Sequence, residues 1–282
     1  PFALDTLPEG SDQEPNNDAS SAQKVQLPII LNGRMDRAND EDVFQVEGRA
    51  GDTIVAEVTA RRLDSPLDSL LRVTDASGKV LAFNDDHEDA GAGTNTHHAD
   101  SYLMVTLPAD GPYFVHLTDT ARMGGDEYAY RLRISAPQPD FALRVVPSSV
   151  AMRAKSNATV SVYAIRKDGF TGDIKLGLKD PPGGFTASLM TLSAKQEVAR
   201  LAVKTTLTET KEPVNLVIEG RAKIGDRDVA HEAVPAEDKM QAFLWRHLVP
   251  AEDLKALVYD PSFSPPPKRV PPPAPADVSW PR

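Results

Sequence analysis

Residues 52–59 read Asp-Thr-Ile-Val-Ala-Glu-Val-Thr, and Ile54, Ala56 and Val58 stand at every second position of this stretch. Successive side chains of a β-strand point to opposite faces, so this spacing is typical of a strand with one face in a core. Short apolar runs recur along the first half of the chain, at 25–31, 43–46, 70–73, 80–83, 102–107, 113–117 and 128–134. About eight short strands separated by turn residues predict an antiparallel β-sandwich.

The second half repeats this pattern, with apolar runs at 141–146, 159–165, 174–178, 198–203, 214–218 and 228–231. About six strands in roughly 100 residues are typical of an immunoglobulin-like sandwich, although the Cys, Trp and Cys positions of antibody domains are absent. Between the halves, the prolines of Ala-Pro-Gln-Pro-Asp at 136–140 supply no N–H for a sheet. We therefore predict an all-β chain of two tandem antiparallel β-sandwiches, a jelly-roll-like one at 25–136 and an immunoglobulin-like one at 140–235, after an acidic N-terminal linker at 1–24.

The chain changes character after Pro235. Four apolar residues then lie at helical spacing, namely Met240, Phe243, Leu244 and Leu248. This spacing predicts a short helical or irregular segment at 236–260. In the stretch 261–282, nine of 22 residues are proline, which predicts an extended Pro-rich C-terminal arm without a core of its own. Trp280 has little of its own chain to pack on in this arm, so we expect it to bind a partner.

The composition excludes several classes of protein. The 282 residues include no Cys, which rules out disulfides and thiolate chemistry. Lys and Arg number 31 against 41 Asp and Glu, a net charge of −10, and an acidic surface repels nucleic acid. No apolar stretch approaches the roughly 20 residues that cross a bilayer, so no transmembrane span is predicted. Because no leader precedes Pro1, we expect a mature product or a fragment of a longer chain.

The negative charge is concentrated in the first half. Residues 1–140 carry 25 acidic and 11 basic side chains, a net charge of −14, whereas residues 141–282 carry 16 acidic and 20 basic ones, a net charge of +4. Two short segments are especially acidic, 12–18 (Asp-Gln-Glu-Pro-Asn-Asn-Asp) and 36–42 (Asp-Arg-Ala-Asn-Asp-Glu-Asp). Ca²⁺ takes roughly six to eight oxygen ligands, which two such loops could supply if they face each other. Asp and Asn also form turns and cap backbone groups without any metal, and this alternative stays open.

Several short motifs occur in the same order as in a known family. They are Glu14-Pro15-Asn16-Asn17, Leu31-Asn32-Gly33-Arg34-Met35, Asp40-Glu41-Asp42-Val43-Phe44, Leu67-Asp68-Ser69, Asn84-Asp85-Asp86, Asp100-Ser101 and Ala109-Asp110-Gly111-Pro112-Tyr113-Phe114-Val115. Together they resemble the bacterial pre-peptidase C-terminal domain, a family that includes the collagen-binding domains of clostridial collagenases. The resemblance extends over about residues 10–136, close to half of the chain.

This resemblance implies a jelly-roll-like β-sandwich on a secreted or surface protein, often beside a peptidase domain, with Ca²⁺ bound where the N-terminal linker meets the sandwich. The family's ligand positions fall on Asp12, Glu14, Asn16 and Asn17 in the linker, on Asn39 or Asp40, and on Asp42. Asn17 stands where an Asp is often found, and Asn39 where the collagen-binding members carry an acid. The smaller negative charge implies weaker affinity for Ca²⁺ or a purely structural site.

A second candidate site lies in the stretch 84–101, which contains three of the six histidines. Its candidate metal ligands are Asp85, Asp86, His87, His97, His98 and Asp100. Imidazole with carboxylate is a common ligand set for zinc and other transition metals. Two other interpretations stay open, because the related family has the Asn-Asp-Asp and Asp-Ser elements without the histidines. The residues would then form a hydrogen-bonded network between neighbouring loops, or contact a partner.

Aromatic residues of the late strands in the first half also have two interpretations. These residues are Tyr102, Tyr113, Phe114, Tyr128 and Tyr130. Exposed on a sheet, they would bind an extended polypeptide or a glycan. Aromatic residues in strands more commonly face the core, which is the alternative.

Enzyme signatures are missing from the sequence. It contains no Gly-x-Ser-x-Gly elbow, phosphate-binding loop, dinucleotide fingerprint or His-Glu-x-x-His motif. We therefore predict a non-catalytic, calcium-stabilised module for binding or adhesion, located in the periplasm, on the cell surface or outside the cell, whose partner is another protein or an extracellular polymer. Two alternatives are a structural subunit of a cell-envelope or membrane-associated complex, anchored through the Pro-rich arm, and the accessory domains of a secreted peptidase.

Overall fold

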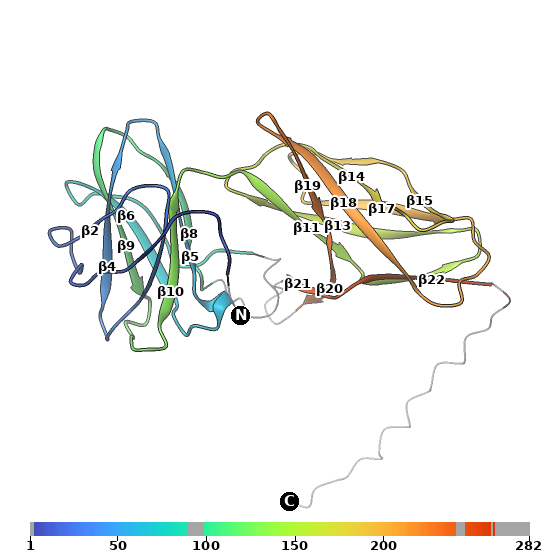
Figure 1. Cartoon of the computed structure of the whole chain (residues 1–282), viewed down its shortest axis with the longest axis horizontal. Helices are drawn as coiled ribbons and strands as arrows, with labels where there is room; N and C mark the ends of the chain where they lie inside the picture. The colour runs from blue at the N-terminus through green and yellow to red at the C-terminus, as the bar shows by residue number, and fades with distance from the viewer. Residues whose placement is uncertain (1–2, 90–98, 241–245, 261, 263–282) are drawn as a thin grey trace, which may run out of the picture.

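The computed structural model describes residues 3–89, 99–240, 246–260 and 262. Two β-sandwiches follow one another along the chain (Figure 1), and the crossing between them runs from β10 (Ala129–Ser135) to β11 (Asp140–Val146). Within the described ranges, the sole helical element is the 3₁₀ turn η1 (Arg61–Leu63), and no helix has the length and hydropathy needed to cross a membrane. The prediction of an all-β chain with two sandwiches is confirmed.

The first sandwich consists of two five-stranded sheets. One has the order β1-β3-β10-β5-β8, with the bounds Glu9–Ser11, Ile29–Arg34, Ala129–Ser135, Thr53–Thr59 and Tyr102–Thr106. The other has the order β2-β4-β9-β6-β7, with the bounds Gln23–Lys24, Glu41–Gly48, Gly111–Asp119, Ser69–Asp75 and Val80–Asn84. Neighbouring strands are antiparallel except for the two short N-terminal strands, since β1 is parallel to β3 and β2 is parallel to β4.

The second sandwich has larger sheets. One has the order β15-β17-β13-β11-β20-β21, with the bounds Phe185–Ala187, Val198–Thr205, Asn157–Lys167, Asp140–Val146, Val234–Met240 and Arg246–Pro250. The other has the order β12-β22-β18-β14-β16, with the bounds Ser149–Arg153, Leu254–Tyr259, Val214–Ile224, Ile174–Lys179 and Met190–Leu192, and β19 (Arg227–Glu232) also pairs with β18. Parallel pairing is found here between β11 and β20 and between β12 and β22.

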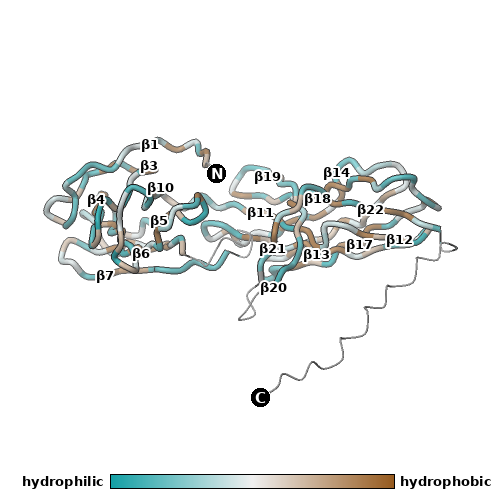
Figure 2. Tube along the Cα trace, turned by 90° about the horizontal axis from the view of Figure 1, so that it is seen from below, coloured by the Kyte–Doolittle hydropathy of each residue, from teal (hydrophilic) through white to brown (hydrophobic). Residues whose placement is uncertain are grey.

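Alternation along the strands builds a separate core in each sandwich. In the first, β5 buries Ile54, Ala56 and Val58, as the opening sequence pattern predicts. In the second, β11 buries Phe141 and Leu143 in the same way. Full burial of one large apolar side chain contributes about 1.5–3 kcal/mol relative to exposure. Figure 2 shows hydrophobic stretches following the strands of the second sandwich and hydrophilic ones filling many loops of the first.

The N-terminal segment predicted as a linker lies against the first sandwich. Its strand β1 extends one sheet and its strand β2 extends the other. Between these strands, the backbone N–H of Val43 on β4 donates to the carbonyl oxygen of Asn16 at 3.0 Å. The segment therefore crosses from sheet to sheet, and its acidic residues lie next to β4.

The helical prediction for 236–260 is wrong. The described part of this segment forms β20, β21 and β22, and β20 pairs antiparallel with β21. Leu254, Ala256 and Val258 of β22 alternate into the core of the second sandwich, and the strand pairs with β12 and β18 on its two sides. Pairing on both sides and burial outweigh weak local helix propensity. The second sandwich thus continues past the predicted end at residue 235 to Tyr259.

Candidate metal centre

The N-terminal segment and β4 bring three carboxylates together. Asp12 and Glu14 lie between β1 and β2, and Asp42 is the second residue of β4. One carboxylate oxygen of each residue lies within 4.8 Å of the other two. The structure therefore brings together three of the ligands predicted from the sequence, and we refer to Asp12, Glu14 and Asp42 as the carboxylate cluster.

Buried oxygen atoms without a hydrogen-bond partner lie next to this cluster. Asn16 is fully buried, and its Nδ2 donates to Asp12 Oδ1 at 2.6 Å, whereas its Oδ1 has no partner. Asp42 is also fully buried, and its Oδ2 accepts a hydrogen bond from the Tyr130 hydroxyl, whereas its Oδ1 has no partner. A buried polar atom without a hydrogen bond costs about 1–3 kcal/mol. A cation at this position would remove that cost for both oxygens.

Burial and mutual repulsion oppose negative charge on the bare cluster. Burial raises the pKa of Asp42 to about 8, and repulsion from Asp12, Asp40 and Glu14 adds to the effect. Burial likewise raises the pKa of Asp12 to about 6, although the hydrogen bond from Asn16 acts in the opposite direction. A bound cation would favour the deprotonated form of both carboxylates, so metal binding and proton release are coupled.

Tyr130 and Gly33 also shape the site, although no motif in the sequence places either of them there. Tyr130 on β10 is 4% exposed and pairs with Gly33 on β3. A Cβ atom at position 33 would lie 2.4 Å from the Tyr130 hydroxyl oxygen and 2.7 Å from the Cβ of Asp12. Only glycine leaves room for both neighbours. No local signal in the sequence joins these two positions, because they meet only through strand pairing.

The remaining predicted ligands, Asn17, Asp40 and Asn39, each make other contacts. Asn17 donates from Nδ2 to Glu14 Oε2 at 3.0 Å, which orients that carboxylate. Asp40 is buried and accepts from the backbone N–H of Asp36 at 2.6 Å, while its Oδ1 lacks a hydrogen bond. Asn39 is an exposed turn residue with φ of 62°, and its backbone N–H bonds to the carbonyl of Arg122. Of these three residues, Asp40 has a carboxylate, and it lies outside the carboxylate cluster.

The donor set suits a hard divalent cation. Carboxylate and amide oxygens are the ligands that Ca²⁺ prefers, and the cluster contains no imidazole of the kind that favours zinc. Asp12, Glu14 and Asp42, with Oδ1 of Asn16, would hold the ion. Its charge would offset the repulsion among the three carboxylates, so the residues present fit calcium.

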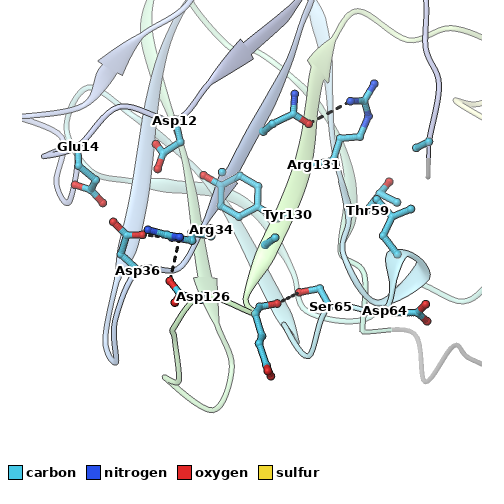
Figure 3. Close-up of a pocket in the computed structure, with 16 residues that line it drawn as sticks. Asp12, Glu14, Arg34, Asp36, Thr59, Asp64, Ser65, Asp126, Tyr130 and Arg131 are labelled. Atoms are coloured by element: carbon cyan, nitrogen blue, oxygen red, sulfur yellow. Dashed lines mark hydrogen bonds and ion pairs between the residues drawn. The ribbon is translucent and has the colours of Figure 1, made fainter. Parts of the chain in front are cut away.

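An open groove of about 870 Å³ lies beside the cluster, and Asp12, Glu14 and Tyr130 form part of its wall. Figure 3 shows Arg34 in this wall, joined to Asp36 at 2.5 Å and to Asp126 at 3.1 Å. The positive charge of Arg34 is therefore paired with two acidic residues of the same sandwich. Because two residues of the cluster also line the groove, solvent reaches the candidate metal site from this side.

The structure describes only part of the second candidate site. Asp85, Asp86 and His87 are exposed, whereas His97 and His98 lie outside the described residues, as does Trp280 of the Pro-rich arm. Asp100 is buried and its carboxylate accepts four hydrogen bonds, from the backbone N–H groups of Ala60, Arg61 and Arg62 and from Arg62 Nε at 2.7 Å. Both of its oxygens are therefore occupied within the protein.

Residues beside Asp100 also tie neighbouring loops together. The backbone N–H of Ser101 donates to the Ser69 hydroxyl at 2.8 Å, and Oδ1 of Asn84 accepts from the backbone N–H of Tyr102 at 2.9 Å. This is the hydrogen-bonded loop network that the sequence left open for the Asn-Asp-Asp and Asp-Ser elements. Metal binding by the histidines remains a prediction.

The aromatic residues of the late strands do not form one exposed stripe. Tyr113, Phe114 and Tyr130 are buried, and Tyr102 and Tyr128 are half-buried. The hydroxyl of Tyr113 donates to the carbonyl of Ala109 at 2.6 Å within the same sandwich. For these five positions, burial favours the structural interpretation over a ligand-binding surface.

No protein-family model matches the chain. A protein of Deinococcus radiodurans, described as a probable subtilase-type serine protease, is 37% identical to this chain over 112 residues. The match covers 37% of this chain and 14% of that protein. The chain is thus similar to a small part of a much longer relative.

Proposed function

We propose that this chain is a non-catalytic accessory module of a secreted peptidase or of a related extracellular protein, and that calcium stabilises its first sandwich. The observation that carries the calcium part is the carboxylate cluster with the unpaired, fully buried oxygens of Asn16 and Asp42 beside it. The accessory role is supported by similarity to a 14% portion of a probable subtilase-type protease. As such a module, the chain would bind another protein or an extracellular polymer.

The role of calcium follows from the position of the cluster. Asp12 and Glu14 belong to the N-terminal segment, whereas Asp42 belongs to β4. An ion shared by these residues would join the segment to the sandwich and would remove the repulsion that otherwise separates them. A ligand that binds only the folded state stabilises it by about 2.7 kcal/mol at 100 times its dissociation constant.

The arrangement of hydroxyl, imidazole and carboxylate groups supports a non-catalytic role. Thr74 Oγ1 lies 3.1 Å from His116 Nε2, and His116 Nδ1 lies 2.7 Å from Glu41 Oε1, which is the bonding order of a hydrolytic triad. Thr74 is 5% and His116 9% exposed, and Arg72 also bonds to Glu41 at 2.8 Å. The hydroxyl is enclosed in an internal network and is not presented to a substrate.

Thermal unfolding of the full chain in a Ca²⁺ titration tests the calcium proposal. We expect saturating Ca²⁺ to raise the melting temperature of the first sandwich by about 10 °C relative to chelator. Asp42→Asn keeps the shape of the side chain but removes its charge, so it should abolish this increase. Equal melting curves with and without Ca²⁺ in the unsubstituted protein would refute the proposal.

Asp119→Asn is the matched control. Asp119 is also a buried carboxylate of the first sandwich, but its two oxygens accept from the backbone N–H groups of Asp68 and Met123. This variant should lose stability and keep the calcium response. The accessory role is tested separately, since the purified chain should not hydrolyse casein under conditions in which a secreted subtilase does. Casein hydrolysis that survives removal of contaminating proteases would refute that role.

A further inference from the structure

A tight turn of the second sandwich reaches the first sandwich. Asp168 and Gly169 follow β13 and both have positive φ angles, of 46° and 75°. The backbone N–H of Phe170 donates to the carbonyl of Lys167 at 2.9 Å, which closes the turn. Asp-Gly is a favoured pair where two successive residues adopt positive φ. The turn directs the carboxylate of Asp168 toward β8 and β10 of the first sandwich, as its hydrogen bonds show.

The carboxylate of Asp168 is saturated with hydrogen bonds. Oδ1 accepts from the Tyr102 hydroxyl at 3.0 Å and from a terminal nitrogen of Arg133 at 2.9 Å. Oδ2 accepts from the other terminal nitrogen of Arg133 at 2.7 Å and from the backbone N–H of Gln138 at 2.7 Å. Four bonds fill the acceptor sites of a carboxylate, and two of them form a bidentate pair with arginine.

This ion pair is shielded from solvent. The side chains of Asp168 and Arg133 are 5% and 14% exposed. Burial alone would raise the pKa of Asp168, but the hydrogen bonds from Arg133 and Gln138 hold it below the ordinary value. Arg133 also binds Glu57 on β5 at 2.8 Å, so its guanidinium pairs with two carboxylates. Ion pairs on the surface contribute little to stability because water screens them. The contribution of a buried bidentate pair depends strongly on its geometry.

The connection between the sandwiches is short and is held by the same carboxylate. β10 ends at Ser135 and β11 begins at Asp140, and two of the four residues between them are prolines. The N–H of Gln138, which lies between those prolines, is the group that bonds to Asp168. The turn also packs against the first sandwich, because a Cβ atom at Gly169 would lie 3.4 Å from the Cε of Met104 on β8.

We propose that Asp168, with Arg133, Tyr102 and the N–H of Gln138, forms a latch that fixes the orientation of the second sandwich on the first. The two sandwiches then form one rigid unit, which holds a ligand of the first sandwich at a set distance and direction from the second sandwich. This inference does not depend on calcium, because none of the latch residues belongs to the carboxylate cluster.

Distance measurements between spin labels test the latch in the full chain. The protein contains no Cys, so the substitutions Ala76→Cys and Lys195→Cys introduce the only two label sites. Both positions are exposed, and they lie in turns of the first and the second sandwich. A latched unit gives a single narrow distance distribution. A broad distribution in this labelled but otherwise unsubstituted protein would overturn the proposal, whatever any latch variant does.

Variants of the latch assign the rigidity to the ion pair. Asp168→Ala in the labelled protein should broaden the distribution several-fold. The exposed Asp173 accepts one bond, from the backbone N–H of Ala194, so Asp173→Ala is the matched control and should leave the distribution narrow. If Asp168→Ala fails to fold, Arg133→Lys keeps the charge but loses the bidentate fork and should also broaden it. A distribution that stays narrow in every folded latch variant would show that other contacts hold the sandwiches, and the latch would be rejected.

Discussion

The two sandwiches share an architecture but bury different kinds of side chain. Among the described residues, the first buries eleven polar or charged residues, namely Asn16, Asp40, Asp42, Ser65, Ser69, Thr74, Asp100, Ser101, His116, Asp119 and Ser135. The second buries three, Asp168, Thr205 and His247. Because buried polar groups cost free energy unless they are paired, the first sandwich depends on specific hydrogen bonds, and the second depends more on its apolar core.

The first sandwich is also the one that contains the carboxylate cluster. The buried carboxylates of the first sandwich differ in their hydrogen bonding: Asp100 caps the turn at η1 and Asp119 joins two loops, whereas Asp40 and Asp42 each retain an oxygen without a hydrogen-bond partner. Of these four residues, Asp42 belongs to the carboxylate cluster. The candidate metal site is therefore distinguished by two features together: an unpaired buried oxygen, and the two other carboxylates that lie close to it.

The substitution with the largest expected effect on stability tests whether the first sandwich depends on its buried polar groups. Asp100→Ala removes four hydrogen bonds and leaves Arg62 without one of its acidic partners. We therefore expect the free energy of unfolding of the first sandwich to fall by about 3 kcal/mol. Asp173 is an exposed carboxylate of the second sandwich, so Asp173→Ala should lower the free energy of unfolding by about 1 kcal/mol or less. Hydrogen exchange read by mass spectrometry reports the opening of each sandwich separately. Equal losses of stability in the two variants would contradict the conclusion that the first sandwich depends on its buried polar groups.

A pH series tests two carboxylates of the cluster, Asp12 and Asp42. The pKa values of Asp12 and Asp42 in the metal-free folded protein are raised from 3.8 to about 6 and about 8. Between about pH 4 and pH 8, the folded state therefore binds more protons than the unfolded state. The free energy of unfolding of the metal-free protein falls as the pH rises through this range. Calcium requires the deprotonated forms, so the stabilisation it adds grows over the same window.

Calcium affinity measured by calorimetry should accordingly fall from pH 8 to pH 6, by on the order of tenfold to hundredfold. The enthalpies observed in buffers of different ionisation heat should show proton release on binding at pH 7. Affinity that stays constant between pH 6 and pH 8 would mean that neither carboxylate changes its protonation state on binding.

A smaller effect separates two buried tyrosines of the same sandwich. Tyr130 donates to Asp42, whereas Tyr113 donates to the backbone of Ala109. Replacing either with Phe should cost about 1 kcal/mol of stability, because each change removes one hydrogen bond. Tyr130→Phe alone should also weaken calcium binding, by about tenfold, since a group that orients a ligand is lost. An unchanged calcium affinity in Tyr130→Phe would remove this tyrosine from the site.

Local patterns predicted much of the first sandwich. The alternation of Ile54, Ala56 and Val58 places a strand with one buried face, and the structure has β5 there. The helical spacing after Pro235 was misleading, because it predicts a helix that includes Leu248, whereas Leu248 lies on the strand β21. Strand partners far along the chain decide such a segment, and a short apolar run by itself does not distinguish strand from helix.

The candidate site was also only partly predictable. The acidic segments 12–18 and 36–42 indicated where oxygen ligands could lie, and the family resemblance implied a larger ligand set, namely Asp12, Glu14, Asn16, Asn17, Asn39 or Asp40, and Asp42. The structure brings one oxygen each of Asp12, Glu14 and Asp42 within 4.8 Å of one another. Asn39 was among the implied ligands, and the structure shows it as an exposed turn residue with a positive φ angle. Residue type indicates which side chains can bind a cation, whereas the fold decides which of them lie close together.

The sequence by itself determined the all-β class, the division near residues 136–140, the absence of thiol chemistry and the acidic segments from which the candidate site is built. These properties depend on residue type and short-range spacing. Only the tertiary structure decided that Tyr130 bonds to Asp42, that Gly33 must leave space for it, and that Asp168 binds Arg133 across the two sandwiches. Each of these contacts joins residues distant in the chain, and its geometry exists only after strand pairing has fixed the register.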